Sequence, residues 1–272
     1  MEKDQYIHAY SEAEKERLLE QVSRWRDIQL HDLPYQAGDE ILEIGCGVGA
    51  LLGEIASDFP SVRLAGIDID PGSIAAAKIY LQSKSDSEAD LRSGQAQSLP
   101  WEKGSFDHVM ISWVLEHNPD PSPILAEAYR VLRPGGSIRV IESDYQGMFI
   151  WPPHPAFDAL QSAYQAFFAL HGNAMVGRRL GSQLAKIGFE KVKSELAGVH
   201  WFQGQGKGDF ADQIAYVGRF MEPSLADMAK ELPIEEDILR NGFDHFSRLP
   251  EMDEASFSAT IYRATAWKSG VI

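Results

Sequence analysis

Short apolar runs alternate with segments of helical periodicity through the first half of the chain. Apolar runs typical of buried strands occur at residues 41–44, 62–67, 91–99, 106–112 and 137–141. The segments between them carry apolar residues at helical spacing, most clearly at 50–56, 74–83 and 124–132. Strands that alternate with helices predict an α/β fold, in which right-handed crossovers build a doubly wound, mostly parallel sheet.

The N-terminal segment predicts one further helix ahead of this alternation. Ser11 and Glu14 have the form of a capping box, and apolar residues follow at helical spacing. We expect this helix to run from about Ser11 to Ile28. Just before it, Tyr6, His8 and Tyr10 alternate in a short polar segment. These three residues could hold the N-terminus against the protein, or could form a lid that closes a substrate pocket against water.

Beyond residue 150 the pattern of apolar positions predicts two helical insertions, at about 151–177 and 208–249. A sixth strand is expected at 192–202, and alternation over 256–268 predicts a last strand. The insertions contain many aromatic residues that would suit an apolar ligand, although most of them could belong to the core. These aromatic residues are Trp151, Phe157, Tyr164, Phe167, Phe168, Trp201, Phe202, Tyr216 and Phe220.

Three glycines at alternate positions, Gly45, Gly47 and Gly49, directly follow the strand at 41–44. Glycine permits a tight turn and lets a ligand approach the backbone, and the following helix N-terminus adds unpaired N–H groups. A turn without a ligand is the alternative, and the acidic Glu43 inside the strand favours a binding site. The spacing differs from the G-x-G-x-x-G of dinucleotide-binding folds, because Ala50 stands where the third glycine would be.

Asp68 ends the second predicted strand and follows Gly49 by 19 residues. Nucleoside-binding α/β folds place an acidic residue about 20 residues on, where its carboxylate accepts hydrogen bonds from ribose hydroxyls. Asp70 precedes the next helix and is expected to serve as its N-cap instead.

The charge and cysteine content restrict the classes of partner and compartment. The net charge of −15 over 272 residues opposes a phosphate backbone, so we expect no nucleic-acid partner. No apolar run approaches the roughly 20 residues that cross a bilayer, so no membrane partner is expected. Cys46 is the single cysteine, which excludes an intrachain disulfide and fits a cytoplasmic setting. In this motif Cys46 fits a small apolar role better than that of a nucleophile. No His/Cys/Asp spacing suggests a bound metal.

Four motifs in order give the sequence a family resemblance. E-I-G-C-G-V-G begins at Glu43, and L-P-W-x(4)-F-D, V-L-E-H and V-L-R-P-G-G-S follow it up to Ser137. Together they resemble the class I, S-adenosylmethionine-dependent methyltransferases, in particular the ubiquinone/menaquinone-biosynthesis-like group. The resemblance implies a Rossmann-like sheet of seven strands, the last antiparallel, with S-adenosylmethionine as cofactor across the carboxyl ends of the first, second and fourth strands.

The resemblance also implies a role for each cofactor-binding position. Residues around the methionine part of the cofactor would be Glu43, Gly45, Cys46, Gly47 and Gly49. Asp68 would hold the ribose and Ile69 would pack on the adenine. The family's usual Gly-Asp-Ala reads Gly94-Gln95-Ala96 here, so either the Gln95 amide or the Ala96 backbone would contact the adenine. Ser112 would offer its backbone near the cofactor amine.

Methyl transfer needs alignment and exclusion of water, and a base where the acceptor must lose a proton. Candidate bases at strand ends are His117, Glu142 and Asp144, with His8 from the possible lid. The chain divides into an N-terminal lid and helix (1–35), a cofactor-binding core (36–150), and the remainder of the same domain (151–272), which carries the insertions as a cap.

We therefore expect an S-adenosylmethionine-dependent methyltransferase acting on a small organic acceptor. Three alternatives stay open: a protein that binds S-adenosylmethionine without methyl transfer, a protein or tRNA methyltransferase, and an NAD-dependent oxidoreductase. The intact insertions disfavour the first, the acidic balance disfavours a tRNA substrate, and the glycine spacing disfavours the last. The oligomeric state does not follow from the sequence.

Overall fold

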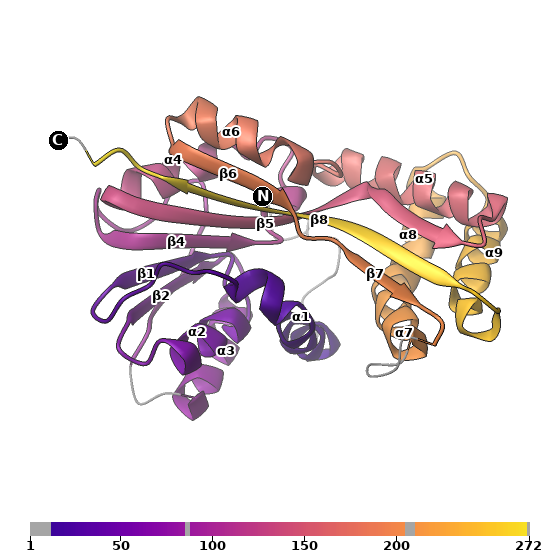
Figure 1. Ribbon diagram of the computed structural model, residues 1–272, viewed down its shortest axis with the longest axis horizontal. Coiled ribbons are helices and arrows are strands. Elements are labelled where there is room, and N and C mark those ends of the chain that lie inside the picture. Colours follow the sequence, from indigo (N-terminus) through magenta and orange to yellow (C-terminus); the bar gives the residue numbers. More distant parts are fainter. Residues whose placement is uncertain (1–11, 85–87, 205–209, 271–272) are drawn as a thin grey trace.

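The centre of the protein is one sheet of eight strands. Figure 1 shows it in the computed structural model, which describes residues 12–84, 88–204 and 210–270. The strands are β1 (Glu40–Ile44), β2 (Arg63–Asp68), β3 (Asp90–Ser93), β4 (Phe106–Ser112), β5 (Leu132–Trp151), β6 (Glu190–Leu196), β7 (Val199–Phe202) and β8 (Ser256–Trp267). Their order across the sheet is β3-β2-β1-β4-β5-β8-β6, and β7 also pairs with β8.

The predicted α/β class and mostly parallel sheet are confirmed. Strands β1 to β5 pair in parallel with their neighbours. β8 runs antiparallel between β5 and the edge, as expected for the last strand. The carboxyl ends of β1, β2 and β4 therefore meet on one edge, where ligands of open α/β sheets bind.

Two strand predictions were wrong in extent. The single strand expected at 192–202 is divided into β6 and β7, so the sheet has eight strands instead of seven. Both pieces pair with β8, and the chain between them comes so close that a Cβ at Gly198 would lie 2.7 Å from the Ala259 carbonyl oxygen. β5 does not end at Ile141 but continues to Trp151, because β8 pairs with it up to that residue.

Helices cover both faces of the sheet (Figure 1), with α4 and α6 on one face and α1 to α3 on the other. Their bounds are α1 (Glu12–Leu30), α2 (Ala50–Asp58), α3 (Pro71–Lys84), α4 (Ser122–Val131), α5 (Pro155–His171), α6 (Leu180–Ile187), α7 (Phe210–Met221), α8 (Leu225–Glu231) and α9 (Glu236–Ser247). In the described ranges no helix is both long enough and apolar enough to cross a membrane.

The two predicted insertions pack together as one helical cap. α9 packs against α5 from the first insertion and against α7 and α8 from the second. Figure 1 shows these four helices gathered around the far halves of β5 and β8. Fully buried aromatic residues such as Phe157, Phe168 and Phe246 fill the space between them. Burial on this scale makes the cap a continuation of the core.

Alternate side chains of the central strands enter separate cores on the two faces of the sheet. Ile41 of β1 belongs to the core that includes residues of α1, α2 and the cap, whereas Leu42 and Ile44 belong to the core that includes residues of α4 and α6. Both faces of the sheet are buried, which explains why the sequences of these strands are almost continuous apolar runs.

Helix α1 is fastened across the sheet and to the cap. Buried Arg139 of β5 donates to the His31 carbonyl oxygen at 2.9 Å, just beyond the end of α1. Near its middle, Arg24 pairs with Asp212 of α7 at 2.7 Å, and Glu20 pairs with Arg219 at 2.8 Å. These contacts hold α1 over the carboxyl ends of the strands, where it closes one side of the candidate site.

Candidate functional site

The glycine-rich turn after β1 is the tightest backbone feature of the site. The N–H groups of Gly45 and Cys46 both donate to the Ile67 carbonyl oxygen of β2, at 2.8 and 3.0 Å. Gly45 has φ 76°, and a Cβ there would lie 2.2 Å from Val114 Cγ2. Gly49 has φ 75° and allows α2 to begin against Ala77 of α3. The turn therefore needs glycine both for its conformation and for close approach of its neighbours.

Asp68 and Asp70 have different surroundings at the end of β2. The Asp68 carboxylate accepts from the N–H groups of Gly47 and Asp70, each at 2.9 Å, and it faces the cavity described below. Burial raises the pKa of Asp68, and the two N–H bonds oppose that rise. Asp70 instead accepts from the Ser73 N–H at 2.8 Å and caps α3, as the sequence predicts.

Glu43 is a buried carboxyl group at the base of the turn. Burial, with repulsion from Asp68, raises its pKa to about 8. Its Oε2 has no hydrogen-bond partner among the described residues, although the side chain borders the cavity. Cys46 borders the same space, and burial raises the pKa of its thiol well above the usual range, so it is not a thiolate nucleophile.

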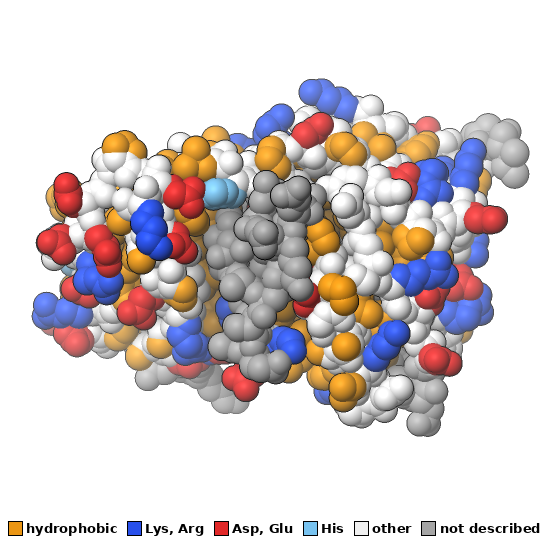
Figure 2. Space-filling model, turned by 180° about the vertical axis from the view of Figure 1, so that it is seen from behind, with side chains coloured by type: hydrophobic (Ala, Val, Ile, Leu, Met, Phe, Trp, Pro, Cys, Tyr) orange, Lys and Arg blue, Asp and Glu red, His pale blue; other side chains and the backbone are white. Residues whose placement is uncertain are grey.

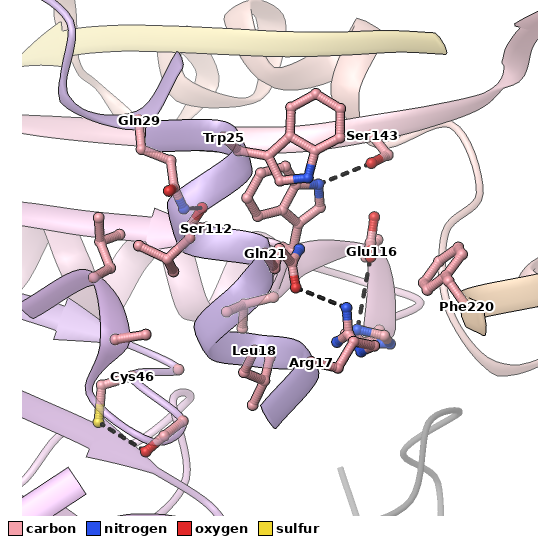
Figure 3. Close-up of a pocket in the computed structure, with 18 of the residues that line it drawn as sticks. Arg17, Leu18, Gln21, Trp25, Gln29, Cys46, Ser112, Glu116, Ser143 and Phe220 are labelled. Atoms are coloured by element: carbon pink, nitrogen blue, oxygen red, sulfur yellow. Dashed lines mark hydrogen bonds and ion pairs between the residues drawn. The ribbon is translucent and has the colours of Figure 1, made fainter. Parts of the chain in front are cut away.

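A single cavity of about 230 Å³ runs from the glycine-rich turn to the helical cap. Figure 3 shows Cys46 at one side of it, Glu116 and Phe220 at the other, and Trp25 of α1 between them. Most of the sequence-derived cofactor residues border this cavity, namely Glu43, Gly45, Cys46, Gly47, Asp68, Ile69, Gln95, Ala96 and Ser112. Gly49 does not border it and instead supports the packing of α2 on α3.

The half of the cavity nearer the cap has aromatic walls. Trp25 lies with its ring centroid 6.3 Å from Trp113, 5.6 Å from Trp201 and 6.4 Å from Tyr216. Its indole N–H donates to the Tyr216 hydroxyl at 3.2 Å. Phe220 lies nearby under the Arg17 guanidinium, 5.7 Å from it. This end of the cavity therefore offers large apolar surfaces.

Of the insertion aromatics proposed for an apolar ligand, Trp201, Tyr216 and Phe220 border the cavity. Phe157, Tyr164, Phe167 and Phe168 are buried in the cap core instead, and Trp151 and Phe202 are exposed at the far end of the sheet.

The three candidate bases differ sharply in their surroundings. His117 borders the cavity, but burial, with a smaller contribution from Arg17, lowers its pKa to about 4. Asp144 also borders it and is held in a two-point ion pair by Arg178. Such pairing occupies the lone pairs with which a base would accept a proton.

Glu142 is a correction to the sequence-based candidates. It is fully buried and does not border the cavity. Its carboxylate accepts from the N–H groups of Val114, Leu115 and Glu116, at 3.0, 2.7 and 3.2 Å. These bonds hold the turn that follows β4, so Glu142 is placed to support the site from behind.

Several residues that border the cavity were not predicted from the sequence. From α1 they are Leu18, Gln21, Trp25 and Gln29, and from other elements Trp113, Glu116, Tyr145 and Thr260. Glu116 stands within the recognised V-L-E-H motif, which could have singled it out. The predicted lid residues Tyr6, His8 and Tyr10 lie outside the described residues. Within the described ranges, no group of three or more His, Cys, Asp or Glu side chains could hold a metal ion.

By sequence, about half of the chain matches known proteins. Residues 42–140 match the family model described as a methyltransferase domain. The chain is 30% identical to a demethylmenaquinone methyltransferase of Lactococcus lactis over 145 residues, which are 53% of this chain and 54% of the relative. It is 34% identical to 27-O-demethylrifamycin SV methyltransferase of Amycolatopsis mediterranei over 153 residues, which are 55% of this chain and 53% of the relative. The chain thus spans about half the length of the curated relatives it matches.

The likeness to solved structures extends over nearly the whole chain. Phosphoethanolamine N-methyltransferase 2 of Haemonchus contortus, solved with phosphomonomethylethanolamine and S-adenosylhomocysteine, aligns with a TM-score of 0.55 and 17% identity. The alignment covers 92% of this chain and 52% of the other. At this identity the likeness shows a shared fold and nothing finer.

Proposed function

We propose that this chain is a class I methyltransferase similar to the ubiquinone/menaquinone-biosynthesis group, which the match of residues 42–140 supports, and that it transfers a methyl group from S-adenosylmethionine to a small organic acceptor. The observation that carries the proposal is the continuous cavity, which joins the glycine-rich turn and Asp68 to an aromatic compartment. A donor at one end and an acceptor at the other would share one space.

The residues at the turn fit the donor. S-adenosylmethionine carries a positive sulfonium and an ammonium group, and the buried Glu43 oxygen without a partner among the described residues is an acceptor for such a group. In this proposal Gly45, Cys46 and Gly47 lie along the methionine part. Asp68 keeps lone pairs for the ribose hydroxyls beside the N–H bonds it accepts. The adenine contacts are proposed for Ile69, Gln95 and Ala96, and Ser112 offers its backbone to the cofactor amine.

The aromatic compartment fits a small acceptor with an apolar body. Three tryptophans and Tyr216 surround it, and α1 closes it from one side. The names of the two curated relatives give a demethylmenaquinone and 27-O-demethylrifamycin SV as their substrates, and both are organic molecules. A tRNA acceptor is disfavoured by the net charge of −15. On the face shown in Figure 2, Lys and Arg side chains are mixed with Asp and Glu instead of forming one basic field.

The protein's contribution to the reaction is positioning. When bound, the cofactor supplies an electrophilic methyl group, and the acceptor must approach it in line. Holding two reactants in such an orientation lowers a barrier by roughly 7 to 11 kcal/mol. The walls from α1 and the cap exclude water, which strengthens every polar contact inside the cavity.

The experiment that tests the proposal is calorimetric titration of the full chain with S-adenosylmethionine. Asp68→Ala should weaken binding about tenfold or more, because the loss of one charge-assisted hydrogen bond is worth roughly 1.5 to 3 kcal/mol. Asp70→Ala is the matched control: removal of the α3 cap costs about 0.5 to 2 kcal/mol of stability and leaves donor affinity near that of wild type. Equal affinity of wild type and Asp68→Ala would overturn the ribose assignment.

Transfer is tested separately from binding. Formation of S-adenosylhomocysteine in the presence of a panel of organic acceptors would support methyl transfer. Tight donor binding without any such product would instead favour a binding protein without transfer.

A further inference from the structure

Glu116 is a buried carboxyl group that borders the cavity and takes no part in the proposed donor contacts. It lies in the short 3₁₀ helix Leu115–His117 that follows β4, borders the cavity, and is 3% exposed. Its Oε1 accepts from the Tyr145 hydroxyl at 3.1 Å, whereas Oε2 has no hydrogen-bond partner in the described part of the chain. Leaving a buried carboxyl oxygen unpaired is costly, so a partner supplied by a ligand would recover stability.

Glu116 is one of the charged or titratable groups that line the cavity, together with Arg17 and His117. Figure 3 shows its side chain near Arg17 and Phe220, across the cavity from Cys46 of the glycine-rich turn. Tyr145, which fixes one carboxyl oxygen, is itself stacked on Phe168 with ring centroids 4.2 Å apart. Tyr145 thus fixes the orientation of the whole carboxyl group, including Oε2, among aromatic side chains.

Charged and titratable groups face Glu116 from four directions. They are Arg17 of α1, His117 on its own element at 3.7 Å, Glu142 and Tyr145 of β5, and Tyr164 of α5. Burial raises the pKa of Glu116, and Tyr145 and Arg17 oppose the rise. His117 stays neutral near pH 7 because its pKa is about 4. Glu116 is therefore better matched than His117 to accept a proton near neutral pH.

The neighbouring cation also indicates the class of acceptor. An ammonium group beside Glu116 would lie close to the positive Arg17, which the same carboxyl group attracts. A neutral hydroxyl group avoids that repulsion, donates to an unpaired carboxyl oxygen, and must lose its proton when its oxygen is methylated. The aromatic walls then suit an apolar body that carries this hydroxyl.

We propose that Glu116 is the general base of the site and that its Oε2 receives the proton of a hydroxyl group on an apolar acceptor. The inference rests on the proposed methyl transfer. The acceptor oxygen forms a bond to the methyl carbon with its own electron pair. The bond between sulfur and that carbon breaks, and its pair stays on sulfur as a neutral thioether. The hydroxyl proton passes to Glu116, which returns it to water after the product leaves.

The test uses β-naphthol as the hydroxyl probe and its methyl ether as a probe of the same shape without a proton to give. Binding of each to the full chain with S-adenosylhomocysteine is followed by tryptophan fluorescence, for wild type, Glu116→Gln and the surface control Glu231→Gln. We expect Glu116→Gln to weaken β-naphthol binding about tenfold, and to change binding of the ether less than twofold. Glu231→Gln should match wild type with both probes.

The dependence on pH separates a proton acceptor from a structural side chain. The wild-type preference for β-naphthol over its ether should grow as the pH is raised through the pKa of Glu116, because the carboxylate is the stronger acceptor. In Glu116→Gln the preference should not change with pH. With S-adenosylmethionine, the rate of methyl ether formation from β-naphthol should fall about 100-fold or more in this variant.

Three results would overturn the inference. Wild type could fail to bind β-naphthol, Glu116→Gln could bind it as tightly as wild type, or the variant could lose both probes equally through a structural role. Donor binding measured on the same samples distinguishes these failures from failure of the proposed function. If S-adenosylmethionine still binds in an Asp68-dependent way, only the role of Glu116 is wrong.

Discussion

Replacement of Gly45 by alanine tests whether the turn after β1 is as closely packed as the structure indicates. The added Cβ would lie 2.2 Å from Val114 Cγ2 and 3.3 Å from Cγ1, well inside ordinary contact. Val114 has little freedom to retreat, because its N–H donates to the Glu142 carboxylate at 3.0 Å. Gly45 also has φ 76°, which an alanine adopts only with strain.

The expected cost is the sum of two separable effects. A left-handed backbone costs a residue with a Cβ roughly 1 to 2 kcal/mol, and overpacking costs about 1 to 3 kcal/mol. Gly45→Ala should therefore lower the free energy of unfolding by about 2 to 5 kcal/mol. Gly38→Ala is the matched control, since Gly38 has φ 92° but nothing within 4 Å of its added Cβ. It should show the backbone cost alone.

The assay is urea unfolding of the full chain followed by tryptophan fluorescence, with the midpoint and slope fitted together. Shortening the neighbour in Gly45→Ala/Val114→Ala should recover about 1 to 3 kcal/mol relative to the additive expectation, because the clash is gone. S-adenosylmethionine affinity should fall in Gly45→Ala and not in Gly38→Ala. Equal costs for the two single glycine variants would refute the reasoning, since Val114 would then not constrain the turn.

Two further predictions concern buried carboxyl groups. Glu43 has a pKa near 8 in the folded chain against 4.5 for the free side chain, so between these values the unfolded state binds fewer protons and stability falls as pH rises. Urea unfolding at several pH values should show that the free energy of unfolding of Glu43→Gln rises relative to that of wild type, by up to about 1.4 kcal/mol per pH unit across this window. Parallel pH profiles of the two proteins would contradict the prediction. Glu142→Gln should lower the unfolding free energy by about 2 kcal/mol or more, because an amide nitrogen then faces backbone N–H donors. An unchanged unfolding midpoint would contradict this supporting role of Glu142.

The parts of the fold that could be predicted are those whose signal is local. The run Ile41–Ile44 is a strand because its own residues are apolar and bury on both faces of the sheet. The residues from 142 to 151 include glutamate, serine, aspartate, glutamine and glycine, and no local signal continues the strand through them. They extend because β8, more than 100 residues later, pairs with them. The division of β6 from β7 likewise depends on β8, at the close approach of Gly198 to Ala259.

The candidate site divides in the same way. Gly45 and Asp68 could be singled out because a turn and a strand end are short-range features with fixed spacing. Trp25 could not, because its place beside Trp113 and Trp201 depends on how α1 is fastened across the sheet and to α7. The sequence motif includes Glu116, but the burial that distinguishes it from a surface glutamate is a property of the assembled cap.

Buried carboxyl groups lie at both ends of the cavity, but only those at the donor end need a cation from the ligand to stabilise their charge. At the donor end, burial raises the pKa of both Glu43 and Asp68, and repulsion from Asp68 adds to the rise at Glu43. A sulfonium bound beside Glu43 would lower its pKa, whereas the neutral thioether product would not. The donor end would therefore hold the charged reactant more tightly than the uncharged product as pH rises. At the acceptor end Arg17 favours the ionised form of Glu116, so the carboxylate that would accept a proton needs no cation from the ligand to stabilise it.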